Sequence, residues 1–209
     1  MIRKIILFTL LSSVFLFAQK AKDIIDDVQK KYEDIDNFSA SFNQIETFKL
    51  TGSKNITSGK IYIKNGEKYR FESEDQKIIT DGKTIWTYNG INKQVLIDKL
   101  TPGSGALLPR DILFKYPKEY YATLLGTEKE KGKKMYKLRL DPKEDTNNFI
   151  KAIKLWVENK SWLIKKIETM DVNGNTTAFE LTAIDIKTKL PDSLFQLEIT
   201  KDMHVVDMR

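Results

Sequence analysis

The amino-acid sequence predicts a mainly β fold with some α-helix, built on a single, strongly curved antiparallel sheet. Short runs that alternate apolar and polar residues follow one another from Ser58 to Leu100, and period-two alternation is typical of a sheet with one wet face. The turn pairs Asn65-Gly66, Asp81-Gly82 and Asn89-Gly90 separate these runs, and such pairs tolerate the positive φ of tight hairpins. Alternation alone favours an ordinary β-sandwich core, but so many hairpins in series favour one curved sheet.

The first segment, Met1–Ala18, is predicted to be a secretory signal peptide. Arg3 and Lys4 precede an almost unbroken apolar run, and Ala18 offers a small residue for cleavage. The run is shorter than the roughly 20 apolar residues that a membrane span needs, and a retained N-terminal anchor is the alternative. Residues 19–209 are then expected to form a single exported domain in the periplasm.

Charge and cysteine content exclude several classes of function. Removing residues 1–18 takes away two of 35 basic residues and none of 29 acidic ones, so the net charge falls from +6 to +4. Because the lysines alternate with acids and the chain is predicted to be exported, nucleic-acid binding is disfavoured. The sequence has no cysteine, which excludes disulfides, thiolate metal sites and cysteine nucleophiles.

The remaining elements follow in chain order. Ala21–Tyr32 carries apolar residues at helical spacing and is predicted to be a helix that packs on the sheet. About ten or eleven strands are expected in all. The runs predicted to be strands are Phe38–Phe48, Lys60–Lys64, Lys68–Glu74, Lys77–Thr80, Lys83–Tyr88, Gln94–Asp98, Lys134–Asp141, Lys151–Glu158, Trp162–Thr169, Thr176–Ile186 and Leu194–Thr200, with Asp202–Arg209 as a further addition.

Residues 106–126 interrupt the strand pattern. Pro109 and Pro117 each fit the first turn of a short helix, and Gly126 fits a C-terminal cap, so two short helices are predicted. These helices carry more apolar residues than exposed helices need. With the leading helix, they are the available cover for the apolar face of the sheet.

No enzyme signature is found. His204 is the only histidine, so a metal site of the usual kind or a catalytic triad lacks its partners. No glycine-rich phosphate loop is present, and no catalytic residue, metal or cofactor is expected. A hydrolase is the least favoured alternative because nucleophile and base are both missing.

The sequence resembles the periplasmic outer-membrane lipoprotein carrier family, LolA. The resemblance rests on the order and spacing of Phe38–Gln44, Gly59–Lys64, Asp81–Asn89 and Phe195–Val206. It implies an incomplete, half-open β-barrel covered by an N-terminal helix and a helical lid. It also implies a monomeric carrier that takes acylated lipoproteins from an inner-membrane ABC exporter to an outer-membrane acceptor. A periplasmic half-barrel that acts as an interaction or sensor module for peptides or other lipids is the alternative.

The resemblance and the apolar pattern together give the expected binding residues. The acyl-chain cavity is predicted to be lined by Phe42, Ile61, Ile63, Tyr69, Phe71, Trp86, Leu138, Leu155 and Phe179. The lid is predicted to present Leu108, Arg110, Ile112, Leu113, Tyr121 and Leu124. The family commonly has an Arg-Pro turn that helps to latch the lid where this chain has Asn65-Gly66, and Arg70 or Arg110 is the candidate substitute.

Overall fold

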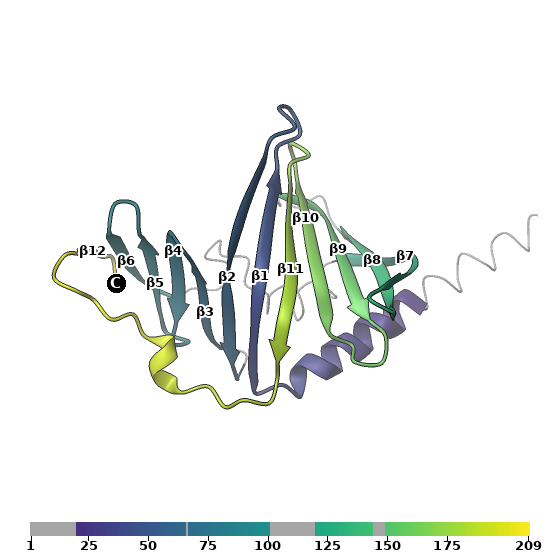
Figure 1. Ribbon diagram of the computed structural model, residues 1–209, viewed down its shortest axis with the longest axis horizontal. Helices are drawn as coiled ribbons and strands as arrows, with labels where there is room; N and C mark the ends of the chain where they lie inside the picture. The colour runs from purple at the N-terminus through teal and green to yellow at the C-terminus, as the bar shows by residue number, and fades with distance from the viewer. Residues whose placement is uncertain (1–19, 66, 101–119, 144–148) are drawn as a thin grey trace, which may run out of the picture. The chain divides into compact units, whose positions relative to one another are not determined.

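The computed structural model describes residues 20–65, 67–100, 120–143 and 149–209 (Figure 1). The predicted signal peptide, Met1–Ala18, lies outside these residues. The described part of the chain holds an α-helix at residues 20–33, which matches the predicted helix, and a short 3₁₀ helix, η1 (Asp192–Phe195). Its strands are β1 (Asn37–Thr47), β2 (Lys54–Lys64), β3 (Lys68–Ser73), β4 (Gln76–Thr80), β5 (Thr84–Asn89), β6 (Gln94–Lys99), β7 (Tyr120–Glu130), β8 (Lys133–Pro142), β9 (Ile150–Glu158), β10 (Ile164–Asp171), β11 (Thr176–Asp185) and β12 (His204–Asp207).

All twelve of these strands belong to one sheet. Their hydrogen-bonded order is β12-β6-β5-β4-β3-β2-β1-β11-β10-β9-β8-β7. The pairs from β2 to β6 and from β7 to β10 are antiparallel. The expectation of a purely antiparallel sheet is wrong at one end, because β12 pairs with β6 in parallel. A mainly β fold with one sheet and a leading helix is confirmed.

The predicted hairpin turns are confirmed in position but differ in form. Asn65 has φ +51° and Gly82 has φ +94°, the left-handed conformation that the Asn-Gly and Asp-Gly pairs favour. The third connection is longer than the predicted two-residue turn. It runs from Gly90 to Lys93, where Lys93 takes the positive φ and Asn89 Oδ1 accepts the backbone N–H of Ile91.

Two predicted elements are wrong within the described residues. Tyr120–Gly126 was expected to be helical, but it forms the first part of β7 and pairs with β8. Gly126 (φ +150°) lies at an irregularity in that pairing and not at a helix end. Leu194–Thr200 was expected to be a strand, but η1 covers its first residues and the rest is irregular.

The chain divides into two compact units. Among the described residues, the first holds 20–32, 47–53, 120–143 and 149–178, and the second holds 33–46, 54–65, 67–100 and 179–209. Strand β11 is therefore shared, with its first residues in unit 1 and Phe179 onward in unit 2. No helix in these residues is long and apolar enough to cross a lipid bilayer.

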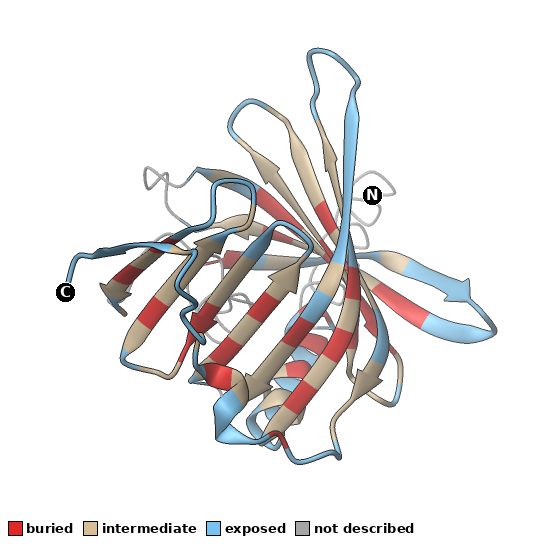
Figure 2. Cartoon of the chain, turned by 60° about the vertical axis from the view of Figure 1, so that its left-hand side comes forward, coloured by how far each residue is buried: buried red, intermediate tan, exposed pale blue. Residues whose placement is uncertain are grey.

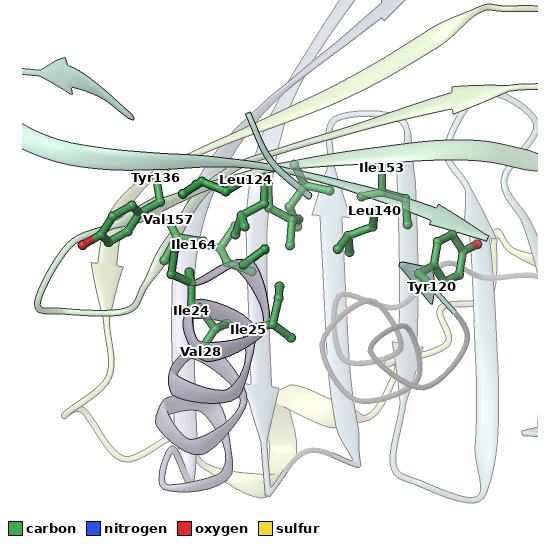
Figure 3. Close-up of a cluster of buried hydrophobic side chains, with 14 residues drawn as sticks. Ile24, Ile25, Val28, Tyr120, Leu124, Tyr136, Leu140, Ile153, Val157 and Ile164 are labelled. Atoms are coloured by element: carbon green, nitrogen blue, oxygen red, sulfur yellow. The ribbon is translucent and has the colours of Figure 1, made fainter. Parts of the chain in front are cut away.

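Unit 1 has a core between the helix and strands β7–β10 (Figure 3). Ile24, Ile25 and Val28 lie on one side of the helix and are buried against the sheet. The phenol of Tyr32 extends this contact, because its oxygen accepts the backbone N–H of Ile164 at 3.2 Å. The core members contributed by the strands are Tyr120, Leu124, Tyr136, Leu138, Leu140, Ile153, Leu155, Val157, Ile164 and Ile167.

Unit 2 is the antiparallel meander of β2–β6 with β1, the end of β11 and the C-terminal segment. Buried and less buried residues alternate along β1 and β3, as period two requires (Figure 2). Phe195 of η1 is completely buried, so the C-terminal segment contributes to the packing of this unit and does not merely follow it.

Candidate functional site

The register of the β2–β3 hairpin defines an apolar face of unit 2. Ile61 lies opposite Phe71, and Ile63 lies opposite Tyr69. Directly opposed residues of an antiparallel pair point to the same side of the sheet, so these four side chains share one face. The next strand extends this face, because Tyr69 pairs with Thr80 and Phe71 with Ile78.

Three phenylalanines from separate strands meet on this face. Phe42 of β1 stacks on Phe71 of β3 with ring centroids 4.6 Å apart and an interplanar angle of 18°. Phe179 of β11 lies edge-on to both rings, at 5.9 Å from Phe42 and 6.4 Å from Phe71. Edge-to-face and offset-stacked rings are the favourable arrangements of aromatic side chains. We call Phe42, Phe71 and Phe179 the aromatic cluster.

Strand β2 lies between β1 and β3 in the sheet, and Gly59 makes room there for the cluster. A Cβ atom on Gly59 would lie 2.5 Å from Cζ and 2.8 Å from Cε1 of Phe42. The Phe42 ring therefore occupies the space that any larger residue at position 59 would fill. A glycine inside a strand often marks such a close approach.

The apolar face carries no charge over strands β2 to β4. Its members there are Ile61, Ile63, Tyr69, Phe71, Ile78 and Thr80. Tyr69 is buried, and desolvation raises the pKa of its phenol, so the phenol stays neutral at physiological pH. A surface of this kind offers hydrophobic contact and cannot perform acid–base chemistry.

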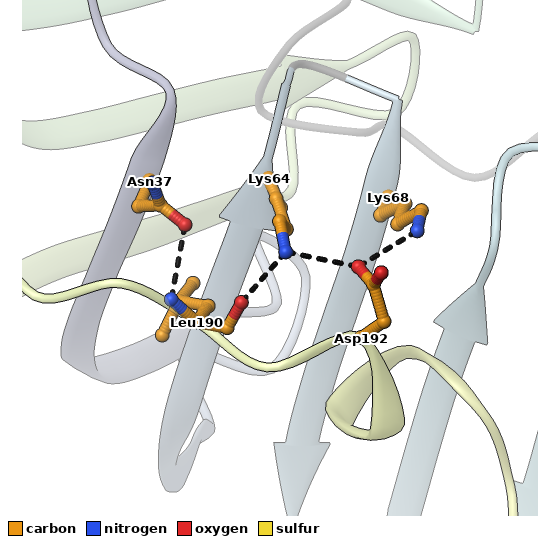
Figure 4. A network of polar contacts seen from close by, with 5 residues as sticks. All are labelled: Asn37, Lys64, Lys68, Leu190 and Asp192. Carbon is orange, nitrogen blue, oxygen red and sulfur yellow. Dashed lines mark hydrogen bonds and ion pairs between the residues drawn. The ribbon is translucent and has the colours of Figure 1, made fainter.

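The opposite face of the same hairpin is basic and holds the C-terminal segment (Figure 4). Lys64 donates to the Leu190 carbonyl oxygen at 2.8 Å and to Asp192 Oδ1 at 2.9 Å, and Lys68 donates to the same Asp192 oxygen at 2.8 Å. Hydrogen bonds and charge from the two lysines lower the pKa of Asp192 to about 2. Asn37 Oδ1 accepts the N–H of Leu190 at 3.0 Å. Residues 190–192 are thus tied to three strands of unit 2.

Arg70 also serves this opposite face. Its Nη1 donates to the Leu194 carbonyl oxygen at 3.1 Å, and its Nε donates to Glu72 Oε2 at 2.8 Å. Burial opposes ionisation of Glu72, but hydrogen bonds from Arg70 and Lys77 lower its pKa. Because Arg70 alternates with Tyr69 and Phe71 along β3, it points away from the apolar face. It therefore does not fit the suggested role of a latch on that side.

Trp86 was predicted to line the same cavity, but the register places it on the other face. Trp86 pairs with Ile79, and Ile79 pairs with Arg70. Trp86 therefore points to the side of Arg70, away from Tyr69 and Phe71. The apolar character of Trp86 does not show which face it takes, because the face depends on the register across the Asp81-Gly82 turn. Counting across that turn places Thr80 and Ile85 on the apolar face instead, and both are buried.

The other predicted binding residues lie elsewhere. Leu138 and Leu155 are buried in the unit 1 core with the N-terminal helix. Leu124 belongs to that core from strand β7, and Tyr121 on the same strand is exposed, so these two residues do not belong to a helical lid. The predicted lid residues Leu108, Arg110, Ile112 and Leu113 lie outside the described residues.

The described ranges contain no group of three or more His, Cys, Asp or Glu side chains placed to hold a metal ion. His204 begins β12 at the end of the sheet, where its backbone N–H donates to the Lys93 carbonyl oxygen at 2.8 Å. The candidate site is therefore the apolar face and its aromatic cluster.

Comparison with known proteins identifies the relatives of this chain. The profile of the family described as outer membrane lipoprotein carrier protein LolA matches residues 33–198. An outer-membrane lipoprotein carrier protein from Legionella pneumophila (strain Corby) is 29% identical over 206 residues, covering 96% of this chain and 98% of the relative. One from Haemophilus ducreyi is 25% identical over 213 residues, covering 100% and 96%.

Solved structures show the same fold at low sequence identity. An uncharacterized conserved protein from Thermus thermophilus superposes with a TM-score of 0.60 at 14% identity, covering 90% of this chain and 99% of that one. The MucA/MucB complex structure from Pseudomonas aeruginosa includes a chain that superposes with a TM-score of 0.53 at 15% identity, covering 90% and 63%.

Proposed function

The chain belongs to the LolA family of outer-membrane lipoprotein carriers, and we propose that it is a periplasmic carrier for the acyl chains of lipoproteins. It receives them from the inner-membrane lipoprotein-releasing ABC transporter and delivers them to the outer membrane. The observation that carries this proposal is the uncharged face of β2–β4 with its aromatic cluster. This face suits a ligand that is itself apolar and offers no group for bond chemistry.

The hydrophobic effect supplies the affinity. Each methylene removed from water contributes about 0.8 kcal/mol, so even part of an acyl chain gives firm binding. Binding to rings and branched side chains is non-directional, which suits chains that adopt several arrangements. A carrier of this kind does not set its own direction, because a ligand moves toward the site that binds it better. Direction therefore comes from the exporter and the acceptor.

The finer parts of the proposal come from the family resemblance. The sheet is proposed to be an incomplete, half-open barrel, with the acyl chains against the face of Tyr69 and Phe71. A helical lid remains a prediction for residues 106–119 only, since Tyr120–Gly126 belongs to β7. The protein is further proposed to act as a monomer without a cofactor.

A charge placed on the apolar face tests the proposal. Tyr69→Glu puts a carboxylate into a buried apolar site, where an unpaired charge is strongly disfavoured. Tyr62→Glu is the matched control, because Tyr62 pairs with Arg70 and so points to the basic face of the same hairpin. We expect Tyr69→Glu to release at least about tenfold less lipoprotein from spheroplasts, and Tyr62→Glu to release a normal amount.

Normal release by a folded Tyr69→Glu protein would contradict the acyl-chain site. Circular dichroism and a thermal melt on both variants establish that they are folded. Native mass spectrometry of the wild-type protein adds a test that needs no variant, because a bound acylated ligand is expected. A bound peptide without acyl chains would favour the interaction-module alternative, and turnover of acyl esters by the purified protein would favour a hydrolase.

A further inference from the structure

Four exposed apolar residues lie on two neighbouring turns of unit 1 and just before the start of β9. The β1–β2 turn carries Phe48 and Leu50, and the β10–β11 turn carries Val172 next to Phe149, which precedes β9. These residues are 39%, 98%, 50% and 65% exposed, in that order. Single exposed apolar residues are ordinary, but a contiguous exposed group is a sign of an interaction surface. We call Phe48, Leu50, Phe149 and Val172 the tip cluster.

Hydrogen bonds hold the β1–β2 turn in a defined shape. The N–H of Gly52 donates to the Phe48 carbonyl oxygen at 2.8 Å, and the N–H of Phe48 donates to the Ser53 carbonyl oxygen at 3.0 Å. Gly52 takes φ +67°, a conformation that glycine adopts at little cost. Leu50 thus lies within a closed turn and is 98% exposed. The β1–β2 turn that carries it can be followed in Figures 1 and 2.

Further bonds join the two turns into one surface. The N–H of Lys49 donates to Asn175 Oδ1 at 3.1 Å, and the N–H of Val172 donates to the Phe149 carbonyl oxygen at 3.0 Å. The Lys49 stem lies over Gly174, since a Cβ there would be only 2.6 Å from Lys49 Cδ. These contacts hold the two turns side by side, so their exposed apolar residues lie on neighbouring parts of unit 1.

Among the described residues, lysines outnumber acids on and next to these turns. Lys49 lies between Phe48 and Leu50 in the chain, Lys151 follows Phe149 by two residues, and both lysines are exposed. The described acid of these turns, Asp171, keeps its charge, and its carboxylate accepts the N–H groups of Asn173 and Asn175, both at 2.8 Å. Cations next to exposed leucine and phenylalanine suit an interface where apolar tails lie beneath anionic headgroups.

We propose that the tip cluster is a contact site for the surface of an anionic lipid bilayer. Leu50, Phe48 and Phe149 enter the boundary between headgroups and acyl chains, and Lys49 and Lys151 face lipid phosphates. An exposed turn cannot enclose a small ligand, but a fluid bilayer can accept it. The inference rests on the proposed function, since a carrier of acyl chains must bring its cargo to a membrane.

The absence of cysteine from the sequence makes a direct test simple. Leu50→Cys and Ile91→Cys are each labelled with an environment-sensitive fluorophore. Ile91 is the matched control because it is 81% exposed on the β5–β6 turn of unit 2. With vesicles of phosphatidylethanolamine and phosphatidylglycerol, we expect the label at 50 to shift to the blue and to be quenched by lipids with spin-labelled acyl chains. The label at 91 is expected to keep its emission in water.

An unlabelled pair of variants measures the affinity. Leu50→Ser should lower the vesicle partition coefficient by about ten- to a hundredfold, the factor expected from removing one buried leucine side chain. Ile91→Ser should leave it unchanged. Vesicles of phosphatidylcholine alone should bind the wild-type protein more weakly, because the electrostatic attraction is lost.

Three outcomes would overturn the inference. These are an unshifted label at 50 on the anionic vesicles, equal partition coefficients for Leu50→Ser and wild type, and a shift only with membranes that retain their proteins. The last result would assign the tip cluster to a protein pocket. Failure here is separable from failure of the carrier function, because Leu50→Ser should still copurify with acylated ligand while Tyr69→Glu should not.

Discussion

Replacing Gly59 by alanine tests whether the aromatic cluster depends on the gap that this glycine leaves in β2. An added Cβ would overlap the carbonyl oxygen of Glu72 on the neighbouring strand and would lie 2.5 Å from Cζ of Phe42. The first neighbour is backbone within a hydrogen-bonded pair, and the second is a buried ring stacked on Phe71. Neither can move freely, so the strand spacing or the ring position must change.

The expected cost follows from overpacking. Forcing one extra carbon into a tightly packed site costs typically about 1–3 kcal/mol. For a chain of this length, that cost lowers Tm by roughly 3–9 °C. The ring stack should also loosen, because Phe42 gains room only by leaving Phe71. Lipoprotein release should therefore fall together with stability.

Gly90→Ala is the matched control for this measurement. A Cβ at Gly90 would meet the Asp75 backbone at 3.4–3.6 Å, which is ordinary contact distance. Urea unfolding of both variants should show a reduced midpoint for Gly59→Ala and a change within about 0.5 kcal/mol for Gly90→Ala. Equal stability of the two variants, with the Phe42–Phe71 ring contacts retained in NMR spectra, would refute the reasoning.

Three further predictions concern stability. Asp192 has a pKa of about 2 in the folded protein, below the unfolded value of about 3.9, so its stabilising effect is complete above about pH 5 and is lost as pH falls toward 2. Asp192→Asn should therefore unfold at a lower urea concentration than wild type at pH 7, and this difference in midpoint should disappear as the pH is lowered. Tyr32→Phe leaves the Ile164 N–H without its acceptor and should cost about 1–2 kcal/mol in urea unfolding, whereas Tyr121→Phe on the exposed Tyr121 should cost almost nothing. Leu124→Ala should cost about 2–4 kcal/mol because Leu124 is core, and an unchanged thermal midpoint would instead favour a detachable segment there.

The strands of the central meander were predictable because two independent local signals agree there. Alternation specifies which face each residue takes, and the turn pairs specify where each strand ends. The strand predicted for Lys68–Glu74, for example, is β3 at Lys68–Ser73. The helix at 20–33 was equally predictable, since apolar residues at helical spacing show both that a helix forms and which side of it packs on the sheet.

The error at Tyr120–Gly126 shows where local signals fail. A short run of mixed apolar and small residues fits a short helix as well as a strand, and Gly126 resembled a helix cap. Pairing with β8 decided the outcome, because Leu124 lies opposite Leu138 and buries its side chain in the core. The pairing follows from a hairpin turn at Lys131 and Gly132, which both take positive φ, so the signal lay in the turn after the run and not in the run itself.

The attachment of the C-terminal segment, by contrast, leaves no local signal in the sequence. The ion pairs from Lys64 and Lys68 to Asp192 join residues more than 120 positions apart. In the sequence these lysines are simply the wet side of an alternating strand. Phe195 alternates with Leu197 and Ile199, which suggested a strand, but Phe195 is buried in η1. The end of the sheet at β6 is taken by β12 instead.

The apolar face and the attachment of the C-terminal segment depend on one register. Because side chains alternate along β3, the parity that places Tyr69 and Phe71 on the apolar face also places Lys68 and Arg70 on the side of Asp192 and the Leu194 carbonyl. A slip of one residue between β2 and β3 would exchange the two sets. A single insertion in the 65–67 turn should therefore abolish ligand binding and release the C-terminal segment together, so neither feature can vary while the other is kept.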